Sequence, residues 1–355
     1  MDTIKSNNSL IVFGNKGLGL LKSLILKNNY SKLFVLVDEN TKKNCLSFFL
    51  KQLENSFKIN ILEIKSGEVN KNIETCEYLW NELSNQGADR KSALINLGGG
   101  VICDLGGFVA STFKRGISFY NVPTTLLSMV DASVGGKTGI DFGLLKNQIG
   151  IFNEPKMVLI FSKWLKTLDK RQILSGFAEM LKHGLILDKI YWEKLSSLKT
   201  VDINNIDKMI YNSVVLKNSI VLKDLKERNI RKVLNFGHTL GHAVESSYLS
   251  SKKELLHGEA IAIGMILESF LSYKVLRLSY DDLINITKTI IYFFKKIKID
   301  NSQIIEIINL LKHDKKTVEG KINFVLLNGI SDTKIDVLVD KSLINDAFKF
   351  YNNLS

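Results

Sequence analysis

This chain has little of what linkers and disulfide frameworks require. It contains two prolines, Pro123 and Pro155, and it has no low-complexity linker and no internal repeat. Its three cysteines, Cys45, Cys76 and Cys103, form no CxxC pair, and their odd number does not suggest a disulfide framework. We therefore expect three reduced thiols in a reducing compartment.

Long hydrophobic runs are also missing. No uninterrupted apolar stretch is long enough to span a bilayer, and the apolar stretch near the start is too short for a signal peptide. These two absences argue against an integral membrane protein and against a secreted one. We expect a cytoplasmic protein without a membrane partner.

Positive charge is in excess, but it is not gathered in one place. The chain carries 48 Lys and Arg against 36 Asp and Glu, a net charge of +12. A nucleic-acid-binding protein with such an excess would bind DNA tightly and in a salt-sensitive way, and it would hold no zinc. No basic run is interleaved with aromatic residues, so a Lys-rich composition that serves small anionic ligands fits better. We expect no nucleic-acid partner.

The first half of the chain alternates short apolar strands with helical patterns. Strands are predicted at 9–14, 33–37, 59–64 and 93–97. This alternation indicates a parallel sheet with crossover helices, in which ligands gather at the carboxyl ends of the strands. Asp38, Glu68 and the glycine triplet 98–100 lie at or just past those ends.

From about Lys170 onward, apolar residues recur with the 3.6-residue period of helices. The predicted helices lie at 171–187, 203–227, 232–249, 258–277, 280–297 and 301–312. Only 323–327 is predicted as a late strand. A chain of 355 residues suffices for two domains. We expect an α/β N-terminal nucleotide-binding domain with a parallel sheet at 1–168 and a mostly α-helical C-terminal metal- and substrate-binding domain at 169–355.

The segment 98–147 combines glycine clusters with charged and hydroxyl side chains. Glycine lets the backbone approach a ligand closely. The charged residues of this segment that matter here are Arg115, Lys137, Lys146, Asp104, Asp131 and Asp141. A segment that only packs has no use for so many charges between apolar runs. We therefore interpret it as a site for a phosphorylated, polyhydroxylated ligand.

Nucleotide binding is indicated at the ends of the second and fourth predicted strands. Gly14, Gly17 and Gly19 do not make the GxGxxG fingerprint. Asp38 ends the second strand, where an acidic residue usually binds a ribose hydroxyl, although the same residue also suits the cap of the helix that follows. The glycines of 98–101 leave backbone N–H groups available for a pyrophosphate.

A metal site is indicated by three of the five histidines, His238, His242 and His257. His238 and His242 are four residues apart and share a helix face, while Glu179 comes from an earlier predicted helix. Two imidazoles, a carboxylate and an open position describe a catalytic zinc site. A lone histidine is more often structural, but three flanked by glycines favour a site. Spacing leaves open which of them bind the metal, and the missing HExxH glutamate argues against a metalloprotease.

In combination, these motifs resemble those of the 3-dehydroquinate synthases of the shikimate pathway, a sugar-phosphate cyclase family. The resemblance runs from about Gly14 to Leu327 and rests on GGGVICDLGGFVAS, PTTLLSMVDASVGGKTGID, KNQIG, GFAEMLKHG, NFGHTLGHAVE, LHGEA and HDKK. It implies a lyase that uses NAD and a divalent metal, Zn²⁺ or Co²⁺. It also implies conversion of 3-deoxy-D-arabino-heptulosonate 7-phosphate to 3-dehydroquinate and phosphate, by transient NAD-linked oxidation, phosphate elimination, re-reduction and intramolecular aldol closure.

The resemblance also assigns roles to residues of this chain. The implied metal ligands are Glu179, His238 and His257, which moves His242 to the substrate side. The positions that match NAD contacts are Asp38, Glu68, Lys71, Gly99, Gly100, Val101, Asp104, Thr124, Thr125, Lys146 and Thr167. The implied catalytic residues are Lys137, Lys182, His242, Glu227 and Asp131. The implied substrate contacts are Arg115, Asn147, Lys217, Arg231, Asn235, Lys315 and Lys316.

Within this set, Lys137, Asn147 and His242 are expected to hold the substrate phosphate, and Lys217 and Arg231 suit its carboxylate. Arg115 matches an arginine that reaches across a dimer interface, so a homodimer is expected. For most single lysines a solvated surface position is the simpler interpretation, and Asp131 also suits a helix cap. Cys103 departs from the family, which commonly has glycine there, and it makes the predicted pyrophosphate turn bulkier.

Two other kinds of enzyme share much of this pattern. A related sugar-phosphate cyclase with another substrate would differ at His242 and at the phosphate-binding residues. A metal-dependent polyol dehydrogenase would share the nucleotide domain and the metal, but it has no need of Lys137, Lys217 and Arg231.

Overall fold

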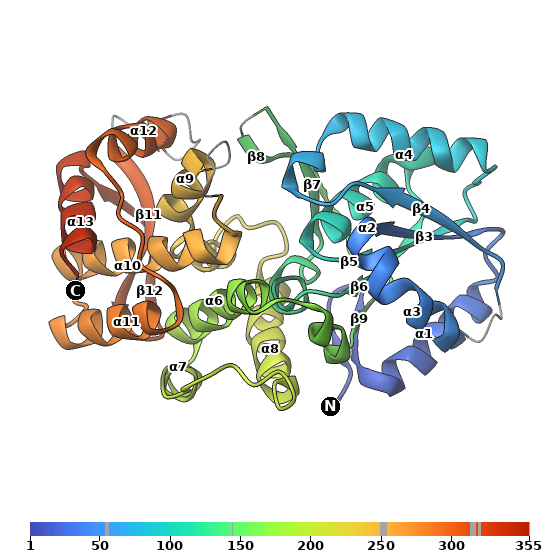
Figure 1. Ribbon diagram of the computed structural model, residues 1–355, viewed down its shortest axis with the longest axis horizontal. Coiled ribbons are helices and arrows are strands. Elements are labelled where there is room, and N and C mark those ends of the chain that lie inside the picture. Colours follow the sequence, from blue (N-terminus) through green and yellow to red (C-terminus); the bar gives the residue numbers. More distant parts are fainter. Residues whose placement is uncertain (54–56, 144, 249–253, 313–316, 319–320, 355) are drawn as a thin grey trace. The chain divides into compact units, whose positions relative to one another are not determined.

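The structure is a computed structural model that describes residues 1–53, 57–143, 145–248, 254–312, 317–318 and 321–354 (Figure 1). The chain divides into two compact units. The first comprises Met1–Asp169 and Asp202–Lys226, and the second comprises Lys170–Val201 and Glu227–Ser355. Residues 202–226, which lie inside the range expected for the second domain, therefore group with the first unit.

The first unit is built on a seven-stranded sheet with the order β1-β2-β9-β6-β5-β3-β4. Its strands are β1 (Ile4–Lys5), β2 (Leu10–Phe13), β3 (Leu33–Asp38), β4 (Ile59–Ile64), β5 (Ala93–Gly98), β6 (Ser118–Pro123) and β9 (Met157–Ile160). The edge pair β1–β2 is antiparallel and the other neighbouring strands pair in parallel. The α/β N-terminal domain with a mostly parallel sheet is thus confirmed, and the four predicted strands correspond to β2, β3, β4 and β5.

The strands of this sheet are apolar in continuous runs because helices cover both faces. In β3, Phe34, Val35 and Leu36 are all fully buried. Helices α4 (Ile73–Asn85) and α5 (Gly100–Thr112) contribute to the core on one side, together with Phe34 and Leu36. Gly106 lets α5 approach the sheet, since a Cβ at this position would lie 2.0 Å from the Asn96 side-chain oxygen. This packing fixes the first turn of α5 at the carboxyl end of β5.

The remaining elements of the first unit connect and flank the sheet. The helices are α1 (Gly14–Asn28), α2 (Glu39–Thr41), α3 (Ser47–Gln52) and α8 (Asp207–Lys223). Short helical turns lie at Lys42–Leu46, Glu68–Asn70, Phe113–Arg115, Ser128–Ala132 and Ser162–Thr167. An antiparallel hairpin, β7 (Lys137–Phe142) and β8 (Leu145–Phe152), lies within and just after the glycine-rich segment 98–147 and was not predicted.

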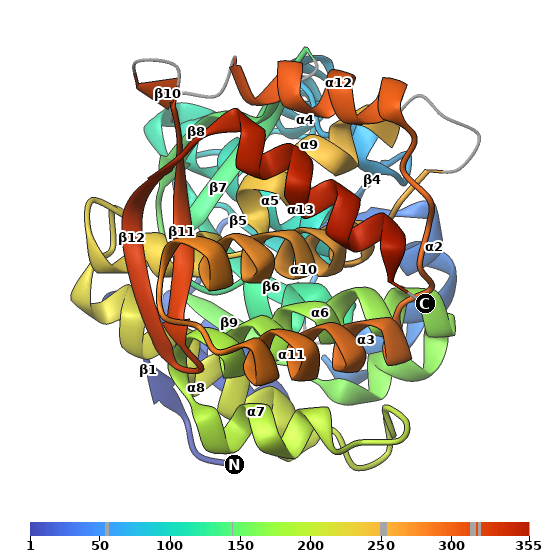
Figure 2. The same ribbon diagram turned by 90° about the vertical axis from the view of Figure 1, so that its left-hand side faces the viewer.

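The second unit is mostly helical and carries a small antiparallel sheet (Figure 2). Its helices are α6 (Lys170–Leu187), α7 (Lys189–Ser196), α9 (His238–Tyr248), α10 (His257–Val275), α11 (Tyr280–Phe293), α12 (Asn301–Lys312) and α13 (Lys341–Asn353), with a helical turn at Ile230–Asn235. Its strands are β10 (Thr317–Val318), β11 (Lys321–Gly329) and β12 (Asp332–Val339). The mostly helical C-terminal domain is confirmed, but the prediction of a single late strand was wrong.

Two predicted helices are shorter than expected, and a left-handed residue lies at the break of one and four residues beyond the end of the other. The helix predicted at 232–249 is interrupted at Gly237, whose φ is +78°, so that α9 begins at His238. The helix predicted at 203–227 ends at Lys223, and Glu227 has a φ of +53°. Both breaks place a predicted site residue at or just beyond a helix end, where its direction differs from that of a residue within a helix.

Helix α10 is the centre of the second unit. It packs against α6, α9, α11, α13 and β11, and the stretch from Ala260 to Ser272 is buried on every side. A helix that is mostly apolar on every face belongs in the interior of a protein, and Glu268 is the charged residue within this stretch. None of the helices that the structure describes is both long and apolar enough to cross a membrane.

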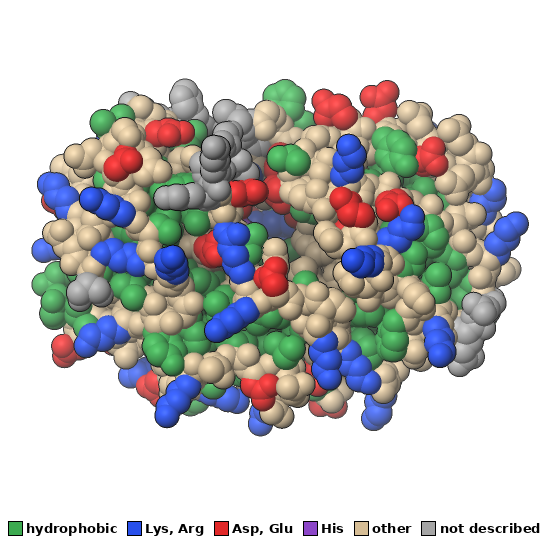
Figure 3. Space-filling view, in the orientation of Figure 1, with side chains coloured by type: hydrophobic (Ala, Val, Ile, Leu, Met, Phe, Trp, Pro, Cys, Tyr) green, Lys and Arg blue, Asp and Glu red, His purple; other side chains and the backbone are tan. Residues whose placement is uncertain are grey.

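The basic side chains of the molecule do not gather on the face seen in Figure 3. Lys and Arg residues are spread there among acidic, apolar and neutral ones. The three cysteines are buried and free. Cys103 points inward from α5, and its Sγ lies 3.8 Å from the carbonyl oxygen of Gly98.

Candidate active site

Asp38 lies at the carboxyl end of β3 and caps the short helix α2. Its Oδ1 accepts hydrogen bonds from the Thr41 backbone N–H at 2.7 Å and from the Thr41 hydroxyl at 2.9 Å. The Thr41 hydroxyl oxygen in turn accepts the Asp38 N–H at 3.0 Å. The cap that the sequence left open as an alternative is therefore present. It is built on one carboxylate oxygen, so it is compatible with a ribose contact through the other.

No side chain caps the N-terminus of α5. Gly99 stands at the N-cap position without a side chain, and Gly100 and Val101 begin the helix. The N–H groups of a helix start and its dipole favour an anion. Thr124 is buried beside this turn, with its N–H bonded to the Gly98 carbonyl at 2.9 Å, and the Thr125 and Ser128 hydroxyls lie 2.8 Å apart.

Lys71 is the buried centre of a polar network in the first unit. Its Nζ lies 2.7 Å from Asp104 Oδ2, 2.6 Å from Asn147 Oδ1 and 3.9 Å from Glu68 Oε1. Burial alone lowers the pKa of Lys71, but the carboxylates of Asp104 and Glu68 outweigh burial and raise it. Burial raises the pKa of Asp104, and the Lys71 ammonium opposes that rise. Four residues expected at the cofactor and substrate are thus joined by direct contacts.

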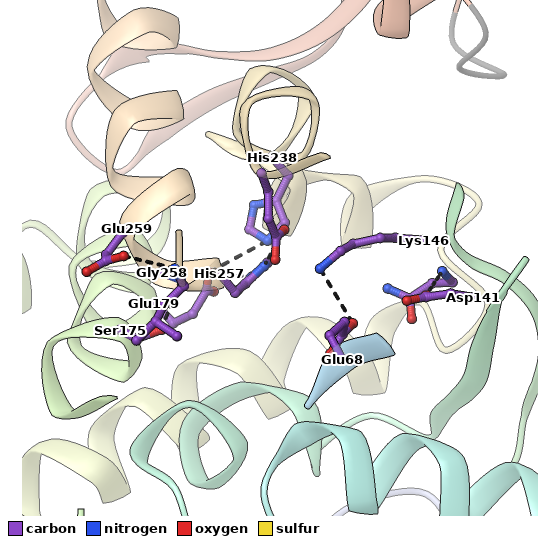
Figure 4. A network of polar contacts seen from close by, with 12 residues as sticks. Glu68, Asp141, Lys146, Ser175, Glu179, His238, His257, Gly258 and Glu259 are labelled. Atoms are coloured by element: carbon purple, nitrogen blue, oxygen red, sulfur yellow. Dashed lines mark hydrogen bonds and ion pairs between the residues drawn. The ribbon is translucent and has the colours of Figure 1, made fainter. Parts of the chain in front are cut away.

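The other predicted residues of the first unit differ in their surroundings. Lys146 Nζ lies 3.5 Å from Glu68 Oε1, as Figure 4 shows. Lys217 donates to the Asp131 carboxylate at 2.6 Å and to its carbonyl at 2.7 Å. The hydroxyl of Thr167, an exposed residue, bonds to the Trp164 carbonyl at 2.7 Å. Lys137, at the start of β7, is exposed.

Arg115 lies on an exposed turn with an unusual backbone. Lys114 and Arg115 have φ values of +48° and +69°, and Gly116 follows at +110°. Left-handed conformations in non-glycine residues cost free energy and concentrate at functional sites. Arg115 is thus an exposed residue of the first unit on a strained turn.

In the second unit, His238, His242 and His257 converge. One ligand atom from each ring lies within 4.8 Å of the others. His238 and His242 come from α9, and His257 is the first residue of α10. Figure 4 shows His238 and His257 directed toward the carboxylate of Glu179 on α6, whose Oε1 is 3.6 Å from the His238 Nε2 and 3.8 Å from the His257 Nε2. The structure thus gathers the predicted ligands together with His242.

The protonation of these rings follows from their surroundings. Burial, followed by the Lys182 ammonium, holds the pKa of His238 well below its usual range. Burial also lowers the pKa of His257, but the Glu245 and Glu179 carboxylates outweigh this effect and raise it to about 10. Lys182 forms an ion pair with Glu179 one helical turn earlier, and both side chains are fully buried.

Hydrogen bonds at the far side of two rings set their tautomers. His238 Nδ1 lies 3.1 Å from the Phe236 carbonyl oxygen, and His257 Nδ1 lies 3.2 Å from Glu245 Oε2. Both partners are acceptors, so Nδ1 carries a hydrogen in each ring. In the neutral His238 ring the lone pair therefore lies on Nε2, on the side of Glu179. Glu245 did not emerge from the sequence, although it lies seven residues after His238 on the same face of α9.

Three further predicted residues lie between α8 and α9. Glu227 has a left-handed backbone, and its Oε1 accepts a hydrogen bond from the Asn235 amide at 2.7 Å. Arg231 is buried in the turn that leads into α9. Lys315 and Lys316 lie outside the described residues.

The donor set of the second unit fits a divalent metal. Imidazole nitrogens and a buried carboxylate are ligands that Zn²⁺ accepts in tetrahedral catalytic sites, and a ring that carries an extra proton releases it when the metal binds. Imidazoles whose other nitrogen donates to a carbonyl or carboxylate are typical of metal ligands. The donors come from α6, α9 and α10, three rigid elements of one unit.

Comparisons with known proteins agree with this geometry. The model of the 3-dehydroquinate synthase N-terminal region matches residues 61–175, and that of the C-terminal region matches residues 176–317. A 3-dehydroquinate synthase of Parabacteroides distasonis is 41% identical over 333 residues, which cover 93% of this chain and 94% of the relative. The chain belongs to the 3-dehydroquinate synthase family.

Solved structures of other cyclases share the fold of this family member. A 2-deoxy-scyllo-inosose synthase, complexed with carbaglucose-6-phosphate, NAD⁺ and Co²⁺, superposes with a TM-score of 0.87 at 23% identity, over 98% of this chain and 99% of that one. ValA, a 2-epi-5-epi-valiolone synthase of Streptomyces hygroscopicus with NAD⁺ and Zn²⁺ bound, gives a TM-score of 0.78 at 24% identity, over 99% and 98%. At these identities the likeness shows the fold alone.

Proposed function

We propose that the protein catalyses the reaction for which its family is named. It converts 3-deoxy-D-arabino-heptulosonate 7-phosphate to 3-dehydroquinate and phosphate, and it uses bound NAD and one divalent metal ion, Zn²⁺ or Co²⁺. The observation that carries the proposal is the convergence of Glu179, His238 and His257 in one unit of a chain that is 41% identical to a 3-dehydroquinate synthase. The cofactors recorded in the two cyclase structures, NAD⁺ with Co²⁺ or Zn²⁺, support it.

Glu179, His238 and His257 would hold the metal. When bound, the metal acts as a Lewis acid that polarises a substrate hydroxyl and lowers its pKa. Lys182, paired with Glu179 in the interior, limits the negative charge that the carboxylate brings to the site. His242, half-buried on the same face of α9, is assigned to the substrate phosphate.

NAD would lie along the carboxyl ends of β3, β5 and β6. Asp38 orients the ribose, and a carboxylate at this position disfavours the extra phosphate of NADP. The N–H groups of Gly99, Gly100 and Val101 hold the pyrophosphate. Lys71, Asp104 and Glu68 form a polar group that is arranged before the cofactor binds, because contacts among the three side chains already set their positions.

The residues assigned to the substrate belong to both units. In the first unit, Lys137 and Asn147 bind the phosphate, and Lys217, which Asp131 holds in place, binds the carboxylate. In the second unit, Arg231 offers a two-pronged donor to a carboxylate, while Glu227 orients the Asn235 amide. Binding that draws on so many cations suits a ligand that carries both a phosphate and a carboxylate.

The homodimer and the cytoplasmic location remain predictions. The left-handed turn at Arg115 supports the homodimer, because strained backbone at exposed residues concentrates at functional sites. Sedimentation of the purified protein tests this prediction directly.

One experiment tests the function. The purified protein is incubated with the heptulosonate phosphate and a catalytic amount of NAD, and released phosphate and NADH are followed together. We expect many turnovers of phosphate release per NAD and no accumulation of NADH. Accumulating NADH without phosphate release would instead identify a polyol dehydrogenase. Turnover only with another sugar phosphate would identify a different cyclase.

A further inference from the structure

A single carboxylate from the middle of α10 holds the start of α9. Glu268 is fully buried, and its Oε2 accepts the Gly237 N–H at 2.6 Å while its Oε1 accepts the Leu240 N–H at 3.0 Å. Gly237 precedes the first residue of α9, and Leu240 is the third residue of the helix. These are the two N–H groups that a capping box satisfies with two local side chains. Here one side chain from another helix satisfies both.

The burial of this carboxylate needs a reason. Apart from two serines, Ser269 and Ser272, the side chains around Glu268 in the buried part of α10 are apolar or glycine, and a carboxylate in such a place is stable only where strong hydrogen bonds replace its contacts with water. A leucine or methionine would fill the same place without that requirement. The N-terminal end of a helix is one of the few interior environments that stabilise a negative charge. The contacts of Glu268 therefore point to a role at the start of α9.

The same peptide bond connects Glu268 to a predicted metal ligand. Glu268 accepts the N–H of the peptide between Phe236 and Gly237, and His238 Nδ1 donates to the carbonyl of that peptide. Because the peptide group is planar, fixing its N–H fixes the direction of its C=O. Hydrogen bonds at the two ends of one peptide also polarise and strengthen each other. The orientation of the His238 ring thus depends on Glu268.

The face of α10 that meets α9 carries both the predicted metal ligand His257 and the buried carboxylate of Glu268. His257, Ile261, Gly264 and Glu268 follow one another at helical spacing along this face. At its middle the two helices touch backbone to backbone, since a Cβ on Gly264 would lie 2.0 Å from the Gly237 carbonyl oxygen. At its two ends His257 bonds to Glu245, and Glu268 bonds to the first turn of α9.

We propose that Glu268 is a positioning residue for the predicted metal ligand His238, acting through the peptide bond between Phe236 and Gly237. The proposal rests on the metal site assigned above. Glu268 keeps His238 in the tautomer whose Nε2 is unprotonated and keeps that nitrogen directed toward Glu179. Groups that orient a metal ligand in this way typically change metal affinity by about 10- to 100-fold when they are replaced.

The test is Co²⁺ binding by the full-length protein and by Glu268→Gln. Both proteins are stripped with a chelator, and Co²⁺ is titrated in while its visible absorption is recorded. The amide has nearly the same shape but no charge, and only one of its two ends accepts hydrogen bonds. We expect the variant to bind Co²⁺ about tenfold more weakly and to show shifted absorption bands, because the His238 ligand is no longer held in one direction.

Ser272→Ala is the matched control. Ser272 is also buried in α10, but its hydroxyl donates to the Glu268 carbonyl at 2.6 Å and accepts the Leu327 N–H at 2.9 Å, so it serves α10 and β11 rather than α9. We expect this variant to lose stability and to keep the Co²⁺ affinity and spectrum of the unmodified protein. A loss of Co²⁺ affinity in both variants would show that Glu268 contributes only to the general stability of the second unit, and it would overturn the proposal.

The remaining outcomes are equally decisive. A folded Glu268→Gln protein with unchanged Co²⁺ affinity and spectrum would overturn the positioning role while leaving the metal site intact. Failure of the unmodified protein to bind Co²⁺ would remove the metal site and this inference together. If Glu268→Gln does not fold, ¹⁵N-histidine spectra of the unmodified, metal-free protein decide. They should show His238 with the proton on Nδ1, and a proton on Nε2 instead would contradict the proposal.

Discussion

The two units arrange their charged groups in opposite ways. In the first unit, unlike charges neutralise each other, since Lys71 pairs with Asp104 and Glu68, and Lys217 pairs with Asp131. In the second unit, three imidazoles face one another, and burial together with Lys182 disfavours a proton on His238. The comparison teaches that protein contacts alone prepare the predicted cofactor side, whereas a bound cation is what would turn the histidine cluster into a mutually attractive group.

The largest expected effect comes from removing one ligand of the histidine cluster. We expect His257→Ala to lose metal and turnover together, with activity reduced at least 10³-fold, because a Lewis acid contributes roughly 4 kcal/mol or more to the transition state. Metal content is measured by atomic absorption and turnover by phosphate release. Glu259→Gln, in the same first turn of α10, removes a charge that pairs with Arg171, and this variant should keep both metal and turnover. A His257→Ala protein that retains both properties would exclude His257 from the site.

A smaller but still large effect is expected in the first unit. Replacing Lys71 by Met leaves the partly buried carboxylate of Asp104 without its cation, which we expect to lower the free energy of unfolding by about 3 kcal/mol. Urea unfolding measures the change. Adding Asp104→Asn to the same protein should recover much of the loss, since the unpaired charge is then gone. Independent, additive effects of the two substitutions would show that this side is not held together by its ion pairs.

Metal removal should affect the two units differently. At a metal concentration a hundred times its dissociation constant, binding stabilises a protein by about 2.7 kcal/mol. We expect chelation to speed amide hydrogen exchange in α9 and α10 while leaving α4 and α5 unchanged, because the ligands belong to the second unit and the Lys71 network needs no metal. Equal acceleration in both units, or none in α9 and α10, would contradict the comparison.

The smallest expected effect concerns Asp38, and it distinguishes the helix cap from the predicted ribose contact. Asparagine caps a helix as well as aspartate does, so Asp38→Asn should keep its stability and bind NAD about tenfold more weakly, through loss of a charged hydrogen bond to the ribose. Asp38→Ala should lose about 1 kcal/mol of stability in addition, since the cap on Thr41 is gone. Calorimetric titration with NAD checks both variants. Unchanged NAD affinity in Asp38→Asn would exclude the ribose contact and show that Asp38 serves only as a helix cap.

The parts of the fold that could be predicted are those with a strong local pattern. The strands β3 and β4 and the helices α6 and α12 lie within one residue of their predicted bounds, because continuous apolar runs and the 3.6-residue period identify them. The hairpin of β7 and β8, the strand β12 and the helices α7 and α13 were missed. The alternation in β12 places only Val337 and Val339 in the interior, so its assignment to a sheet depends on pairing with β11.

The candidate site divides in the same way. Asp38, the glycines of α5 and the three histidines could be named from their types and spacing, since ribose, phosphate and metal each require particular donors. Glu245 and Glu268 could not be named, because each acts on a segment distant from it in the chain. The break at Gly237 was missed for a related reason: a helix interrupted by a single left-handed glycine has an almost unbroken apolar period.

The order of residues along this chain settled its family, its fold class and the kinds of ligand it is suited to bind, because those depend on residue types at fixed spacings. Tertiary packing alone decided which hydrogen-bond partners the His238 and His257 rings have and which partner each buried charge has. Those properties depend on distances of about 3 Å between atoms from different helices, and no local pattern of the sequence specifies such distances.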